Sequence, residues 1–263
     1  MGDGTHQWLL ILVATLFNLL FEYSCRGSDT LSTNPLLFPT LFALYFSLFT
    51  LVEDLIVRFR LRDYHFLIMA FFYGTIYEFF ARGSALSGTG FLGIDWVTLV
   101  FANIVMWASV QGILTFYLAT RVFPRGPHTP LLGERGWIIA LIVNFSALAL
   151  LHAGNHIPPP GITPMLVLVA ILIVTGIIFR SQANKTKWRS AYVPFRKSTI
   201  LDLLCLFTIV IFLFSIWIPV HGPANPYSAL NNVTAWRISM VWACVVAVVL
   251  FIYRVLKGEP IPV

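Results

Sequence analysis

Charged residues are scarce in this sequence. They make up 11% of its 263 residues, against about 25% in an ordinary globular domain. Hydrophobic residues instead reach 58%, and the mean hydropathy is +0.83. This composition excludes a water-soluble domain and indicates an integral membrane protein.

Cysteines and basic N-terminal residues are also few. The three cysteines, Cys25, Cys205 and Cys244, have no paired spacing, which excludes a disulfide framework and a cysteine-based zinc motif. The first residues, MGDGTHQ, lack the basic region of a signal peptide, and no small-residue cleavage site follows the first apolar run. We therefore expect the first helix to remain in the mature protein.

Long apolar runs dominate the chain instead. Crossing a hydrocarbon layer of about 30 Å takes roughly 20 apolar residues in a helix, and backbone groups in lipid must find their hydrogen-bond partners within the segment. The sequence therefore predicts one all-α, polytopic transmembrane domain over residues 1–263. Its eight predicted helices lie at roughly 7–25, 36–57, 65–82, 93–120, 136–153, 163–180, 200–219 and 234–255.

Basic residues lie mainly in alternate connectors. Fourteen of the seventeen follow the even-numbered helices, whereas only Arg26, Arg82 and Arg237 lie by the others. Because cytoplasmic connectors collect positive charge, we predict a multi-pass protein of the cell (inner) membrane with both termini in the cytoplasm. The net charge of +6 then requires no nucleic-acid partner. Residues 180–198 are expected to form a basic cytoplasmic loop that lies against anionic lipid headgroups or, alternatively, docks an acidic partner.

One seven-residue pattern occurs twice, as EYSCRGS at 22–28 and EFFARGS at 78–84. The offset of 56 residues equals one helical hairpin, and both copies stand where an odd-numbered helix leaves the membrane outward. Parallel repeats related by an axis along the membrane normal place equivalent residues at one depth. The pattern predicts an internal repeat of helical hairpins, with chance similarity in a biased composition as the alternative.

Each copy of the pattern contains an acidic residue inside a predicted span. Glu22 precedes Arg26 by four residues, and Glu78 precedes Arg82 by four, so each pair lies on one helical face. A charged side chain at the centre of a membrane helix costs roughly 3 kcal/mol, which makes such acids functional candidates. The alternative for each pair is a structural anchor at the outer interface.

Histidines stand at the outer ends of two further odd-numbered helices. If the helices close into a bundle, His152 and His221 meet Glu22 and Glu78 at one depth. Carboxylates and imidazoles can transfer protons or hold a divalent metal ion such as Zn or Fe. The candidate catalytic or metal-binding residues are Glu78, His152 and His221, and the candidate binding residues are Glu22, Arg26, Arg82, Asn155 and Asn225.

The order of these residues resembles the motifs of the intramembrane CAAX-protease family. That family has a double-Glu element followed by Arg, then a His after an apolar stretch, then a His with Asn four positions later. Here Glu78 with Arg82 resembles the first element, although Tyr77 stands in place of the first Glu. The stretch FSALALLHAGN resembles the second element, and His221 with Asn225 resembles the third. The resemblance implies catalytic roles for Glu78, His152 and His221 and leaves the reaction open.

Three functions follow from these residues. The first is a membrane-embedded enzyme for a lipid, lipid-linked or apolar substrate. The second is a proton- or ion-coupled transporter, in which Glu53 and Asp54 mark the inner end of a charged pathway. The third is a non-catalytic membrane subunit, in which each acid pairs locally, as Asp54 can with Arg58. The expected partners are the bilayer and, for an enzyme, an apolar substrate; no particular oligomeric state is indicated.

Overall fold

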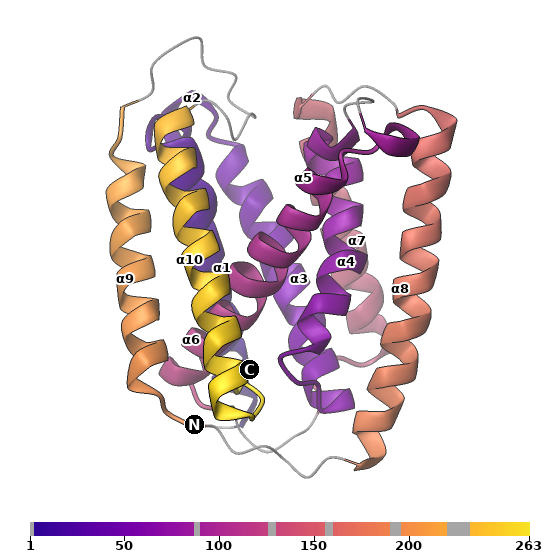
Figure 1. Ribbon diagram of the computed structural model, residues 1–263, viewed down its shortest axis with the longest axis vertical. Helices are drawn as coiled ribbons and strands as arrows, with labels where there is room; N and C mark the ends of the chain where they lie inside the picture. The colour runs from indigo at the N-terminus through magenta and orange to yellow at the C-terminus, as the bar shows by residue number, and fades with distance from the viewer. Residues whose placement is uncertain (1–2, 87–89, 126–129, 156–159, 190–195, 220–231) are drawn as a thin grey trace.

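The protein is a bundle of membrane-length helices (Figure 1). A computed structural model describes residues 3–86, 90–125, 130–155, 160–189, 196–219 and 232–263. It is 84% helical, and no strand occurs among the described residues. Seven described helices are long and apolar enough to cross a membrane, and an eighth, His65–Ala81, is apolar but shorter. The predicted all-α polytopic fold is confirmed.

The described elements follow one another with few irregular residues between them. Three of them, α5, η4 and α6, form one continuous apolar span, Trp96–Val122. In chain order the helices are α1 (Asp3–Arg26), α2 (Asp29–Thr33), α3 (Leu37–Phe59), α4 (His65–Tyr77), η1 (Glu78–Arg82), η2 (Ser84–Leu86), η3 (Phe91–Gly93), α5 (Trp96–Phe101), η4 (Ala102–Leu114), α6 (Thr115–Val122), α7 (Glu134–Asn155), α8 (Ile162–Arg189), α9 (Thr199–Ile216) and α10 (Val233–Lys257).

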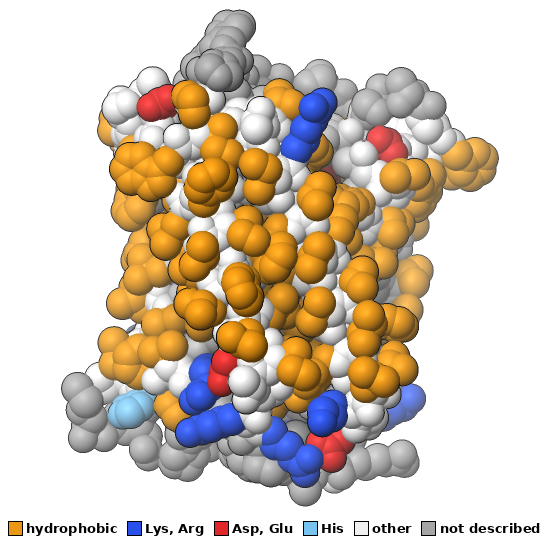
Figure 2. All heavy atoms as spheres, turned by 60° about the vertical axis from the view of Figure 1, so that its left-hand side comes forward, with side chains coloured by type: hydrophobic (Ala, Val, Ile, Leu, Met, Phe, Trp, Pro, Cys, Tyr) orange, Lys and Arg blue, Asp and Glu red, His pale blue; other side chains and the backbone are white. Residues whose placement is uncertain are grey.

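Helices α1 and α3 form the interior of the bundle. Their most apolar stretches are 67% and 72% buried, whereas that of α8 is 11% buried. Helix α1 packs against α3, α6, α9 and α10, and α4 packs between η4 and α8. On the face seen in Figure 2, apolar side chains cover the middle of the surface, as lipid contact requires. Polar side chains on α1, α3, α4 and η4 therefore meet inside the protein.

Element η4 is a π-helix in the middle of its span. Two side chains follow the wider spacing, because Ser109 Oγ donates to the Ile104 carbonyl and Thr115 Oγ1 to the Val110 carbonyl, both at 2.8 Å and five residues back. π-Helical turns are rare and occur frequently at functional sites. This element supplies two buried side chains of the site described below, Trp107 and Gln111.

Both copies of the seven-residue pattern end a helix at a glycine in the left-handed conformation, although the last hydrogen bond spans four residues at Gly27 and five at Gly83. Gly27 has φ 88° and Gly83 has φ 67°, the left-handed conformation that commonly follows a helix C-terminus and favours glycine. The Gly27 amide donates to the Tyr23 carbonyl at 2.8 Å, and the Gly83 amide donates to the Glu78 carbonyl at 2.7 Å. The shared glycine thus has a structural cause, and the internal repeat stays a prediction.

The expected basic loop at 180–198 is wrong in its first half. Residues 180–189 continue α8 to Arg189. Most residues of this stretch, including alanine, glutamine, lysine and arginine, favour helices, so the helix continues after the apolar run ends. Trp188 is 82% exposed there, and the Lys187 ammonium lies 5.4 Å from its ring centre. This part of α8 therefore extends beyond the apolar span as a basic, aromatic helix end.

Candidate functional site

Glu22 lies one turn before the end of α1 and is buried. The Arg26 guanidinium donates to Glu22 Oε2 from Nε at 3.2 Å and from Nη2 at 3.0 Å. The predicted pairing along one helical face is confirmed. Because both side chains are withdrawn from water, each charge compensates the desolvation of the other.

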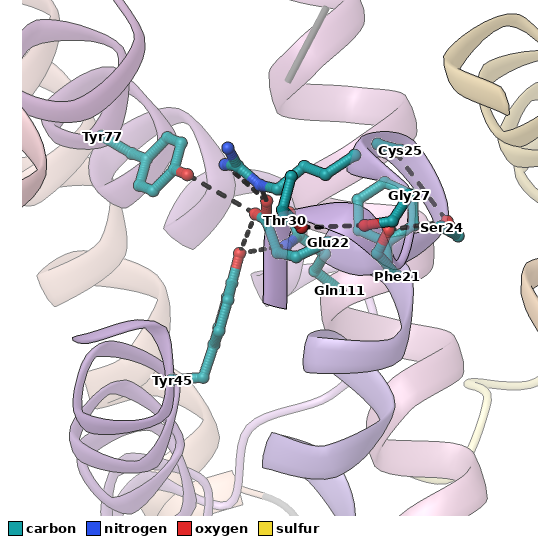
Figure 3. A network of polar contacts seen from close by, with 10 residues as sticks. Phe21, Glu22, Ser24, Cys25, Gly27, Thr30, Tyr45, Tyr77 and Gln111 are labelled. Carbon is teal, nitrogen blue, oxygen red and sulfur yellow. Dashed lines mark hydrogen bonds and ion pairs between the residues drawn. The ribbon is translucent and has the colours of Figure 1, made fainter. Parts of the chain in front are cut away.

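The other carboxylate oxygen of Glu22 is bonded by side chains from two further helices (Figure 3). The Tyr45 hydroxyl on α3 donates to Oε1, and the Tyr77 hydroxyl on α4 donates to it at 3.4 Å. Gln111 on η4 donates from Nε2 to the Tyr45 hydroxyl at 2.9 Å. Residues of four separate elements therefore converge on one buried carboxylate, and we call Glu22, Arg26, Tyr45, Tyr77 and Gln111 the Glu22 network.

An aromatic cavity adjoins this network. The Trp107 ring lies 5.0 Å from Tyr77, 5.2 Å from Tyr73 and 6.4 Å from Tyr45, measured between ring centroids. Residues of α3, α4, η4 and α6 line a partly open cavity of about 40 Å³. Gln111 belongs both to the cavity wall and to the Glu22 network, so it connects the two. Aromatic walls with few polar groups are typical of sites for apolar ligands.

Glu78 has a different environment from Glu22. Its carboxylate is fully buried at the start of η1. Oε2 accepts hydrogen bonds from Ser84 Oγ at 2.9 Å and from the Ala85 amide at 3.3 Å. Glu78 thereby fixes the backbone turn that follows its own helix. The side chain of Arg82, its predicted partner, lies outside the described residues.

His152 contacts the same element from α7. Its Nδ1 lies 3.0 Å from the Phe80 carbonyl oxygen, and its ring makes an edge contact with Phe80 at 6.3 Å. Since a carbonyl can only accept, Nδ1 carries the hydrogen and Nε2 is the acceptor in the neutral ring. Within residues 77–80, therefore, Tyr77 bonds Glu22, Glu78 supplies a second buried carboxylate, and the Phe80 carbonyl contacts His152.

Other predicted site residues lie outside the described part of the chain. These are His221, Asn225 and the side chain of Asn155. Among the residues that are described, no group of three or more His, Cys, Asp and Glu side chains is placed to hold a metal ion. Because the predicted ligand set includes His221, the divalent-metal site stays a prediction.

Two acids near the C-terminal end of α3 are bonded within the protein. Asp54 pairs with Arg58 at 3.0 Å, as predicted, and also accepts from Trp137 Nε1 at 2.9 Å. Glu53 accepts two bonds from Arg125, both at 2.7 Å. Through these contacts α3 is bonded to Arg125, which follows α6, and to Trp137 in α7.

Sequence reasoning missed Tyr45, Tyr77 and Gln111. The available signal was Gln111, which is, with Asn103, one of two amides in a mostly apolar run. Nothing in the sequence separates the two tyrosines from other aromatic residues of the spans. Compared with models of protein families, with curated proteins and with solved structures, the chain matches none.

Proposed function

We propose that the protein is a membrane-embedded enzyme that acts on a lipid or other apolar substrate, with Glu22 as its acid–base group. Arg26 balances the negative charge of the Glu22 carboxylate, and the Tyr45 hydroxyl bonded to it can carry a proton toward the cavity. A carboxylate and a hydroxyl placed in this way are the components of general acid–base catalysis.

One observation carries the proposal: a buried carboxylate is linked through Tyr45 and Gln111 to an aromatic cavity. A structural anchor at the interface needs only the Glu22–Arg26 pair. Two tyrosines and an amide from three other helices exceed that need, and ionisable groups inside a membrane usually mark a function.

The remaining candidates stay part of the proposal. Glu78 and His152 adjoin the network through residues 77–80 and are proposed, with His221, as further catalytic or metal-binding residues. Arg82, Asn155 and Asn225 are proposed as binding residues that donate hydrogen bonds to an anionic intermediate.

The Tyr45→Phe variant tests the proposal. It keeps the ring and removes the hydroxyl that donates to Glu22. The protein is reconstituted into liposomes made from the total lipid extract of its host, and consumed and formed lipids are identified by mass spectrometry. We expect wild type to convert one lipid class and Tyr45→Phe to be slower by a factor of about 100 or more.

Tyr23→Phe is the matched control. The Tyr23 hydroxyl is buried and has no hydrogen-bond partner among the described residues, so its removal should leave turnover unchanged. Equal turnover by both variants, or no lipid conversion by wild type, contradicts the proposal.

A transporter is the second candidate. Buried ion pairs stand near the C-terminal ends of α1 and α3, Glu22–Arg26 and Glu53–Arg125, and the bundle also contains the π-helical η4. Irregular helices and intramembrane charges are typical of ion-coupled transporters. Proton- or ion-dependent solute uptake into liposomes, without any change in lipid composition, favours transport over catalysis.

A further inference from the structure

Gln111 leaves one buried hydrogen-bond acceptor without a partner. The residue is 2% exposed, and Oε1 receives no hydrogen bond from any residue that the structure describes. Leaving a buried polar group without a hydrogen bond is unfavourable, because its desolvation is not compensated. We therefore expect a donor from outside the described residues, such as a bound molecule, to form a hydrogen bond with this oxygen.

The Glu22 network fixes which end of the Gln111 amide is free. A tyrosine hydroxyl has one hydrogen, and Tyr45 donates it to Glu22. Tyr45 can then only accept from Gln111, so the amide NH₂ group must face Tyr45. The carbonyl end is left over, and a ligand at Gln111 must be a hydrogen-bond donor.

The cavity beside Gln111 limits the size and polarity of this donor. Its volume is about 40 Å³, whereas a cavity of about 10–15 Å³ by the same measure already holds one water molecule. A buried water typically makes two to four hydrogen bonds. Most of the wall offers none, because it consists of side chains such as Phe49, Phe66 and Phe116. A hydroxyl group attached to an apolar chain suits the cavity better than water does.

We propose that the cavity binds the hydroxyl-bearing end of a long-chain alcohol, which donates its O–H hydrogen to Gln111 Oε1. The adjoining apolar carbon packs against the aromatic wall, where burial of CH₂ groups is favourable. Long-chain alcohols are then the substrate class of the proposed enzyme. Only the conversion of the bound alcohol rests on the proposed function; its binding does not.

Photolabelling tests the binding step without any turnover. The probes are a long-chain alkanol with a diazirine beside its hydroxyl group and the corresponding methyl ether, which cannot donate. Each is added to the full-length protein in liposomes, and adducts are mapped by mass spectrometry. We expect adducts on cavity residues of α4, such as Met69, and about tenfold more labelling by the alkanol than by the ether.

Two variants distinguish the site from general lipid contact. The Gln111→Leu variant should be labelled equally by both probes, because it lacks the hydrogen-bond acceptor. Val52→Ile adds a methyl group to the cavity wall and should lower alkanol labelling several-fold. Equal labelling of wild type by both probes, or undiminished labelling of Val52→Ile, overturns the proposal. If the alkanol labels the cavity selectively but no lipid is converted, the enzymatic function is refuted and the binding site stands.

Discussion

Burial changes what the Glu22–Arg26 pair contributes to stability. An i, i+4 pair on an exposed helix adds a few tenths of a kcal/mol, but these side chains are only 9% and 5% exposed. The pairing itself could be predicted from the spacing of the two residues. The tyrosines that complete it could not, because they come from helices whose neighbours the sequence does not specify.

Removing one member of this pair should strongly destabilise the protein. Glu22→Gln leaves the Arg26 charge without its partner, and Arg26→Met leaves the Glu22 charge, so each is expected to cost about 3–5 kcal/mol of unfolding free energy. The double variant should lose clearly less than the sum of the two. Denaturation of the purified variants in detergent measures this coupling, and additive losses would show that the side chains do not interact.

The packing of α4 against η4 depends on a residue without a side chain. A Cβ atom at Gly74 would lie 2.1 Å from Asn103 Oδ1 and 2.8 Å from Trp107 Cδ1, so a larger residue would force these two side chains, or the elements that carry them, to move. Hydropathy predicted both spans, but it could not predict this contact or the π-helical form of η4. Apolar runs in a membrane helix carry little periodicity that would distinguish these forms.

Gly74→Ala should therefore disturb the cavity from outside it. Moving η4 away from α4 is expected to lower the unfolding free energy by about 1–3 kcal/mol and to weaken alkanol labelling. Gly176→Ala is the control, because a Cβ there meets Phe72 at an ordinary 3.5 Å and alanine favours the helix. Equal stability of the two variants in thermal unfolding would argue against close packing at Gly74.

The distribution of charge agrees with the direction of the chain across the bundle. Helix α1 begins and α10 ends at the same end of the bundle (Figure 1), where most of the visible Lys and Arg side chains gather (Figure 2). This agrees with the alternation of charge in the sequence, which led to the prediction of cytoplasmic termini. The compartment at each end remains a prediction.

Cysteine labelling in intact cells tests this orientation. Ser32 on α2 and Lys257 at the end of α10 are exposed, and α2 lies at the opposite end of the molecule from the C-terminal end of α10 (Figure 1). A membrane-impermeant maleimide should label Ser32→Cys in intact cells and Lys257→Cys only after the membrane is opened. The reverse pattern would place the Glu22 network at the cytoplasmic side.

The proposed enzyme and its proposed substrate class both require an apolar molecule to enter the cavity beside the Glu22 network. Mass spectrometry of solvent extracts from the purified protein tests this most directly, with wild type compared with Val52→Ile. We predict that wild type carries a hydroxyl-bearing apolar compound that the variant has largely lost. Identical extracts from the two proteins would contradict the account.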